Sequence, residues 1–189
     1  MPATRKPLPR GFYARDTREV AIDLLGTYLV CRAGGVVRIG RIVEVEAYLG
    51  PHDLAAHSAR GRTPRTEVMF GAPGHAYVYM IYGLYFCFNV VTERIGHASA
   101  VLVRAVEPVE NIELNTRGPG LLCRAMGIDR RLNGADLLGE EIRIVAGPEG
   151  PRPKIGRSAR IGVEYSRHWA KRLLRFYVRD SACLSRRPR

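Results

Sequence analysis

Lysine, paired cysteines and long apolar runs are all scarce in this chain of 189 residues. Three of its 30 basic residues are lysines, and its four cysteines include no C-x-x-C pair of the kind that holds zinc or exchanges disulfides. No segment approaches the roughly 20 apolar residues of a membrane span, and the N-terminus lacks the apolar core of a signal peptide. We therefore expect reduced core thiols, with two disulfides as the alternative. The expected location is the cytoplasm, in association with the nucleoid, for a bacterial protein, or the nucleus for a eukaryotic one.

Acidic residues are also few. The 18 Asp and Glu residues against 30 Lys and Arg give a formal net charge of +12 and a pI near 10.1. Such a charge favours a polyanionic partner, either nucleic acid or an anionic membrane. The excess of arginine over lysine does not itself indicate a partner, because codon bias explains it equally well.

The remaining composition is that of one folded domain. With 46% hydrophobic residues, the chain is expected to form a single domain over residues 1–189, with a flexible lead at 1–10 and a basic tail at 186–189. Helices are predicted after Asp16 and at 118–126. Strands are predicted at 28–31, 36–48, 76–80, 84–91, 99–106, 141–146 and 175–179. Because helices and strands do not alternate regularly, the pattern favours an α+β fold with a mainly antiparallel sheet flanked by helices.

The predicted strand at 36–48 places two carboxylates and a phenol on one face. A period of two puts Glu44, Glu46 and Tyr48 together. The opposite face would carry Val43, Val45 and Ala47. One explanation is a half-buried strand with its polar side in water. The other is a general base, because burial and a like-charged neighbour both raise the pKa of a carboxyl; spacing does not say which glutamate would serve.

The connection at 51–74 is rich in Gly, Pro, His and Arg and is of the length that often carries function. His57 is either an ordinary loop histidine or a functional one. A metal site with His52 and Asp53 is not expected, because the spacing matches no standard ligand pattern. The loop is solvated or binds phosphates through Arg60, Arg62 and Arg65.

The stretch YVYMIYGLYF at 77–86 predicts an aromatic β-hairpin. Strand-like segments flank Tyr82 and Gly83, so Tyr82 is expected at or near the tip. Its ring either folds back onto the core or acts as a wedge of the kind that enters between base steps. Tyr77 and Tyr79 share the other face and serve as core residues or as a stacking platform for a base.

Two polar residues interrupt apolar runs, Asn89 in the returning hairpin strand and Arg104 in VLVRAV. Each must be paired if it is buried, because an unpaired buried charge is too costly. A site that uses Glu46 would supply the partner for Arg104.

Read together, these segments resemble a known family. The chain carries in order RIVEVEAYLGP, AAHS, TPR, YVYMIYGLYFCFNVV, VLVRAVEP and ARIGV, and from about Leu8 to about Ser185 it resembles the 3-methyladenine DNA glycosylases of the alkyladenine (mammalian-type) class. The resemblance implies a curved sheet with a protruding, DNA-intercalating hairpin. It also implies a monomeric, cofactor-free enzyme of base excision repair, which flips alkylated purines out of double-stranded DNA and excises them. Hypoxanthine is a further candidate substrate.

The resemblance also implies roles for single residues. Glu46 would be the general base that activates the attacking water, and Arg104 would hold the water and the glutamate in position. The 160–163 segment would contribute backbone near the water. The implied base-binding residues are Tyr48, His57, Tyr79 and Asn89, and the implied intercalating residue is Tyr82. Further DNA contacts are expected from Arg60, Arg62, Arg65, Leu84 and Tyr85. Because the three lysines lie outside 41–104, Schiff-base chemistry is not expected and the enzyme would be monofunctional.

Three positions depart from the family pattern: Val45 where threonine is common, Thr66 where asparagine follows TPR, and Leu121 where lysine is common. The last two bear on DNA affinity and substrate range rather than on the reaction class. Two rival functions remain open. One is a non-catalytic lesion- or DNA-binding module of the same fold, and the other is an enzyme acting on free nucleosides or another glycoside.

Overall fold

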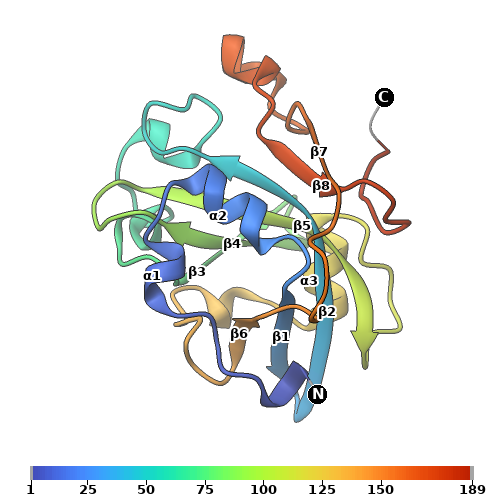
Figure 1. Cartoon of the computed structure of the whole chain (residues 1–189). Coiled ribbons are helices and arrows are strands. Elements are labelled where there is room, and N and C mark those ends of the chain that lie inside the picture. The colour runs from blue at the N-terminus through green and yellow to red at the C-terminus, as the bar shows by residue number, and fades with distance from the viewer. Residues whose placement is uncertain (1, 188–189) are drawn as a thin grey trace.

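A computed structural model describes residues 2–187 (Figure 1). Met1 of the predicted lead and residues 188–189 of the predicted tail lie outside the described residues. Within the lead, the Leu8 amide donates to the Ile144 carbonyl at 2.8 Å, and Pro7 forms a bridge with Val145. No helix among residues 2–187 is long and apolar enough to cross a membrane.

The body of the molecule is one curved sheet in which every strand pair is antiparallel. The strands are β1 (Tyr28–Ala33), β2 (Val36–Tyr48), β3 (Ala76–Ile81), β4 (Tyr85–Thr92), β5 (Ser99–Glu110), β6 (Ile142–Val145), β7 (Ile155–Ser158) and β8 (Arg175–Val178). Their order is β3-β4-β5-β2-β1-β6, and β8 pairs with both β2 and β7. The predicted α+β class and antiparallel sheet are confirmed.

Short helices cover the sheet (Figure 1). The α-helices are α1 (Arg10–Tyr13), α2 (Thr17–Leu24) and α3 (Pro119–Met126), and the 3-10 helices are η1 (Pro2–Thr4), η2 (His57–Arg60), η3 (Glu67–Phe70), η4 (Arg130–Leu132) and η5 (Glu164–Lys171). The expected cap of α2 is present, because the Asp16 carboxylate accepts from the amides of Arg18 and Glu19.

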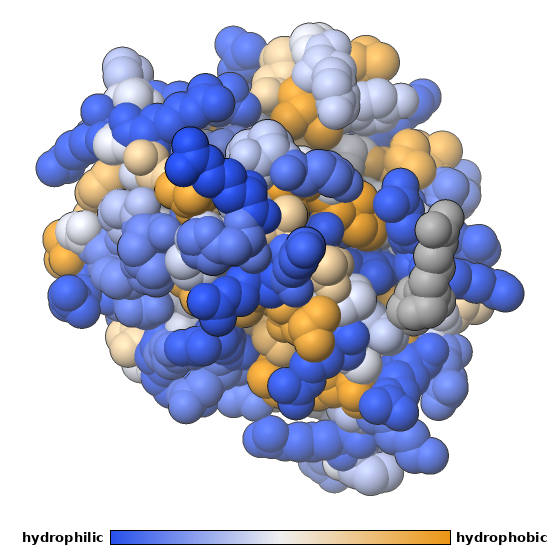
Figure 2. Space-filling model, turned by 90° about the horizontal axis from the view of Figure 1, so that it is seen from above, coloured by the Kyte–Doolittle hydropathy of each residue, from blue (hydrophilic) through white to orange (hydrophobic). Residues whose placement is uncertain are grey.

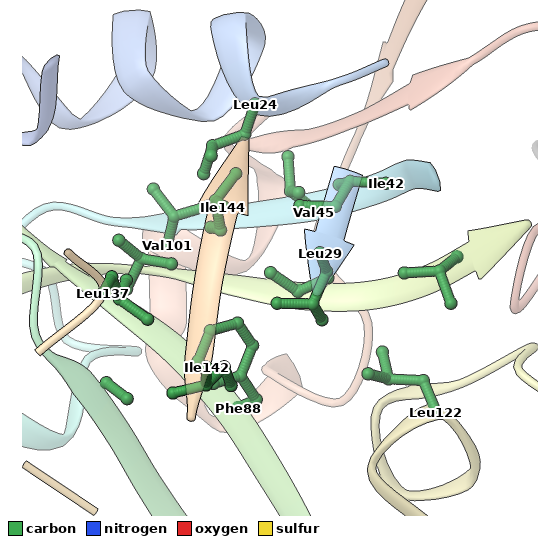
Figure 3. Packing of buried hydrophobic residues seen from close by; sticks show 14 of the residues in the cluster. Leu24, Leu29, Ile42, Val45, Phe88, Val101, Leu122, Leu137, Ile142 and Ile144 are labelled. Atoms are coloured by element: carbon green, nitrogen blue, oxygen red, sulfur yellow. The ribbon is translucent and has the colours of Figure 1, made fainter. Parts of the chain in front are cut away.

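The hydrophobic core lies between these helices and the sheet. Leu24 of α2 and Leu122 of α3 converge with strand residues such as Leu29, Ile42 and Phe88 (Figure 3). All four cysteines are free thiols, and three of them are buried. The expectation of reduced core thiols therefore holds for Cys31, Cys87 and Cys123, while Cys183 is half-buried.

A β-bulge in β2 corrects the predicted alternation. Ile42 pairs with Val106 and Glu44 with Ala105, so Val43 has no partner in β5. This extra residue turns Val43 away from the main core into a separate cluster with Ala105 and Tyr177. The prediction that Val43 shares a face with Val45 and Ala47 is therefore wrong, although Val45 and Ala47 do enter the main core.

Candidate active site

The end of β2 carries a fully buried carboxylate held by three donors. Glu46 Oε1 accepts from the Ile161 amide at 2.7 Å, and Oε2 accepts from the Tyr48 hydroxyl at 2.9 Å. Arg104 Nη1, from β5, lies 3.3 Å from the same Oε2. The predicted pairing of Arg104 with Glu46 is confirmed. Burial and the charge of Glu46 raise the pKa of Tyr48 well above its usual value, so its hydroxyl remains a donor.

Glu44, the second carboxylate of the strand, is also fully buried and makes a different set of contacts. Its Oε1 accepts from Arg175 Nε at 2.7 Å and from Arg104 Nε at 3.1 Å. Ser185 adds its amide at 2.5 Å and its hydroxyl at 2.6 Å. The reading of Glu44 and Glu46 as a solvated polar face is therefore wrong, because both side chains lie inside the protein among arginines.

A cavity of about 350 Å³ opens beside this cluster, a volume within the range of small-molecule sites. Its lining includes Tyr48, His57, Tyr79, Asn89, Arg104 and Tyr82. The structure thus brings together every residue that was expected to bind a base, although they come from four separate segments. Glu46 lies directly behind the wall, because Tyr48, Arg104 and Ile161, its three partners, all line the cavity.

Aromatic rings form one wall of the cavity. The rings of His57 and Tyr79 meet edge to face with centroids 4.6 Å apart, and those of Tyr77 and Tyr79 lie 5.2 Å apart. His57 Nδ1 is 3.0 Å from the hydroxyl of Tyr77. Burial, with the charges of Arg65 and Arg60, lowers the pKa of His57 to about 4. The imidazole is therefore uncharged at neutral pH.

Asn89, which lines the cavity, is nearly fully buried in β4. Its Nδ2 donates to the Tyr77 carbonyl at 3.0 Å, so this amide is paired as its burial requires.

The segment that carries Ile161 is held by a buried ion pair. Arg160 donates to the Asp53 carboxylate with Nη1 at 2.5 Å and Nη2 at 2.8 Å, and neither side chain is exposed. The same guanidinium stacks on Tyr48 at 4.7 Å and donates to the Ala47 carbonyl. These contacts join the loop after β2 to the segment that supplies the Ile161 amide.

The β3–β4 hairpin ends in a three-residue loop over Tyr82, Gly83 and Leu84, since Ile81 pairs with Tyr85. Tyr82 occupies the left-handed region at φ 53° and its surface is 93% exposed. The alternative that this ring folds back onto the core is wrong. A non-glycine residue in this region is strained, and such strain gathers at functional sites.

The expected DNA contacts come from two segments, the loop at 51–74 and the β3–β4 hairpin. Arg65 stacks over Tyr79 at 5.0 Å, and Arg62 pairs at the surface with Glu67. Leu84 is exposed, whereas Tyr85 is half-buried beside Gly120 of α3. Arg60 is exposed at the end of η2. Seen from above, the end of the molecule that carries η5 is mainly hydrophilic with scattered hydrophobic residues (Figure 2).

Thr66 and Leu121, the two departures that bear on DNA affinity, lie in different surroundings. Thr66 is buried, and its hydroxyl accepts from the Thr63 amide at 2.8 Å and donates to the Gly61 carbonyl at 3.0 Å. Thr66 thus braces the basic loop from within. Leu121 is half-buried on α3.

Sequence reasoning missed the residues that organise the site at long range. Asp53 was weighed only as a metal ligand, and Arg175 and Ser185 were not singled out. Their partners lie 107, 131 and 141 residues away, so no local pattern marks them. The one available signal was the rule that a buried charge needs a partner, which led from Arg104 to Glu46.

Comparison with known proteins matches this chain over nearly its whole length. A family model described as methylpurine-DNA glycosylase matches residues 11–182. A protein of Legionella pneumophila (strain Lens) is 57% identical over 182 residues, covering 96% of this chain and 99% of its own. One of Myxococcus xanthus (strain DK1622) is 52% identical over 183 residues, covering 96% and 94%. One of Anaeromyxobacter dehalogenans (strain 2CP-C) is 54% identical over 180 residues, covering 95% and 86%. The names of all three contain the words 3-methyladenine DNA glycosylase.

Proposed function

Because the chain belongs to the methylpurine-DNA glycosylase family, we propose that it flips alkylated purines, above all 3-methyladenine, out of double-stranded DNA and hydrolyses their bond to the sugar. The observation that carries this proposal is the position of Glu46, a buried carboxylate directly behind the wall of an aromatic cavity. The reaction would be the first step of base excision repair. The relatives named above are bacterial, which favours the cytoplasm, and a monomeric state stays a prediction.

In this mechanism Glu46 is the general base. A water molecule admitted beside Arg104 gives a proton to the carboxylate while its oxygen bonds to the sugar carbon. The bond between that carbon and the base breaks, and its electron pair leaves with the base. The Ile161 amide and the Tyr48 hydroxyl fix the carboxylate through one oxygen each, so that it does not reorient during the reaction.

Strand cleavage is not part of the proposal. A glycosylase that also cuts the strand needs an amine nucleophile, and none of the lysines lines the cavity. We therefore propose a monofunctional enzyme that leaves an intact strand without the base.

The cavity fits a cationic base. An alkylated purine carries positive charge, and aromatic ring faces attract cations. Tyr48 and Tyr79 each have an arginine over one face, so the base would contact the other. Since His57 is uncharged at neutral pH, it adds no repulsion. Asn89, which lines the cavity, would crowd the exocyclic amine of guanine. Neutral hypoxanthine is a weaker candidate substrate, because it lacks this attraction.

The hairpin tip would hold the duplex open. Tyr82 is exposed, strained and placed at the edge of the cavity, so its ring would fill the gap left by the flipped nucleotide. Arg60, Arg62 and Arg65, in the loop at 51–74, would contact phosphates.

The test is release of free base from duplex DNA. Wild-type protein is expected to release 3-methyladenine from methylated DNA, measured by chromatography. Glu46→Gln keeps the shape of the side chain but cannot take the proton, so it is expected to lose release while still binding a lesion duplex. A fully active Glu46→Gln would contradict the assignment of the base.

Two controls complete the experiment. Glu93→Gln alters a carboxylate that bonds Thr17, away from the cavity, and is expected to leave release unchanged. Salt-dependent binding by wild-type protein without any release would instead support the rival binding module. Activity on free nucleosides that plain DNA does not inhibit would support the other rival.

A further inference from the structure

Among residues 2–187, the cavity-lining residue that bonds Glu44 is Arg104. The Glu44 carboxylate is fully buried, yet it bonds two arginines and two groups of Ser185. Glu44 and Glu46 together balance the charges of Arg104 and Arg175, so the buried cluster is neutral. Arg104 is the member that connects the two carboxylates, through Nε to Glu44 and through Nη1 to Glu46.

The planar guanidinium explains what this connection does. Arg104 Nε lies 3.1 Å from Glu44 Oε1, and both Nε and Nη2 lie 3.3 Å from Ser185 Oγ. Contacts at Nε and Nη2 fix one edge of a rigid plane. Once that edge is fixed, the direction of Nη1 is determined, and in this structure Nη1 lies against Glu46.

Ser185 connects this plane to the end of the described chain. Its hydroxyl donates to Glu44 Oε1 and accepts from Arg104, while its amide donates to Glu44 Oε2. The next residue contributes as well, because the Arg186 carbonyl accepts from Arg175. The family model ends at residue 182, so Ser185 lies outside the part of the chain that it matches.

We propose that Glu44 and Ser185 are positioning residues, which act through Arg104 to hold Glu46 in the orientation that base excision needs. The inference rests on the proposed function, since it refines the geometry of the same site. It makes the segment at 183–186 part of the active-site architecture, although none of its residues lines the cavity.

A matched pair of serines tests the proposal. Ser181 lies four residues before Ser185, and its hydroxyl donates to the Glu107 carboxylate at 2.7 Å, as that of Ser185 does to Glu44 at 2.6 Å. Both Ser→Ala changes remove one partly buried hydroxyl–carboxylate bond. Only the Ser185 bond leads through Arg104 to Glu46.

We expect Ser185→Ala to slow single-turnover base release about tenfold, since a 1 Å misplacement can lower a rate about 100-fold. Affinity for the lesion duplex should stay within about twofold, because no residue that faces the base has changed. Ser181→Ala is expected to release base at the wild-type rate, and Ser185→Thr, which keeps the hydroxyl, should recover most of the loss. Glu44→Gln should show the same separation of rate from affinity. If thermal melting shows that Glu44→Gln does not fold, the comparison of Ser185→Ala with Ser181→Ala still tests the positioning role.

Three outcomes would overturn the inference: equal release by Ser185→Ala and wild type, an equal loss in both alanine variants, or a loss of affinity that accounts for the loss of rate. Wild-type protein without any release would contradict the proposed function itself. Active wild type with an equally active Ser185→Ala would contradict the positioning role alone.

Discussion

Replacing Asp53 by asparagine is expected to produce a large loss of stability from a change of one atom. The Asp53 carboxylate accepts four hydrogen bonds, two from Arg160 and one each from the amides of Leu49 and Ala55. Asparagine keeps the shape but presents a donor where an acceptor is needed, and it removes the counter-charge of Arg160. Arg160 would then be a buried, uncompensated cation whose Nε already has no partner in the described structure.

The magnitude follows from the burial of the pair. Breaking a buried ion pair by removing one partner costs about 3–5 kcal/mol, and both of these side chains have 0% exposure. The free energy of unfolding of a natural domain is about 5–15 kcal/mol, so this change would remove about a fifth of it or more. With a urea m-value of about 2 kcal/mol/M, the unfolding midpoint should fall by about 1.5–2.5 M.

Urea unfolding followed by circular dichroism measures this change. Glu67→Gln is the control, because it breaks the exposed pair with Arg62 and is expected to leave the midpoint unchanged. A midpoint for Asp53→Asn within about 0.5 M of the wild type would refute the reasoning, since m-values near 2 kcal/mol/M would then leave about 1 kcal/mol for the buried pair.

Two further predictions concern the hairpin and the cavity wall. Tyr82→Ala should weaken binding to lesion-bearing duplex more than binding to plain duplex, by the roughly 1–3 kcal/mol that stacking of one base is worth. Fluorescence anisotropy with both duplexes measures the difference, and equal losses would argue against a wedge. His57 binds its proton more readily in the unfolded chain, with a pKa near 6.5, than in the folded protein, where the pKa is about 4. The contribution of His57 to the free energy of unfolding is therefore complete above pH 6.5. It is lost as the pH falls towards 4, by about 3 kcal/mol at most. His57→Asn should remove this part of the pH dependence in urea unfolding at pH 7 and pH 4.5, and parallel wild-type and variant profiles would count against it.

The sequence was sufficient for the parts of the fold that local patterns encode. The capping Asp16 marked the start of α2, and alternation marked β2 at 36–48 with the observed bounds. The tip at Tyr82 followed from strand-like segments on both sides. By contrast β7, with only four residues that include Gly156 and Arg157, has neither alternation nor a run of β-branched residues, and it was missed.

The site was predictable only where one residue required another. Arg104 lies in an apolar strand, so its charge required a buried acidic partner, and Glu46 was the predicted partner. No comparable rule connects Arg160 to Asp53 or Ser185 to Glu44, because each partner lies in a segment of ordinary polarity. The bulge at Val43 was not predictable either, because the sequence alternation of β2 continues through that position without interruption.

The pairing of β2 with β8 also bears on the order in which the molecule assembles. The hairpin that carries Tyr79 and Tyr82 closes between neighbouring segments, and the bonds of Glu44 and Glu46 to β8 and its flanks close loops of more than 100 residues. Loop-closure entropy delays such distant contacts relative to local ones. During synthesis and refolding we therefore expect the aromatic surface to form first and the carboxylate cluster to be completed last. A partly folded chain would then resemble a binding protein before it becomes an enzyme.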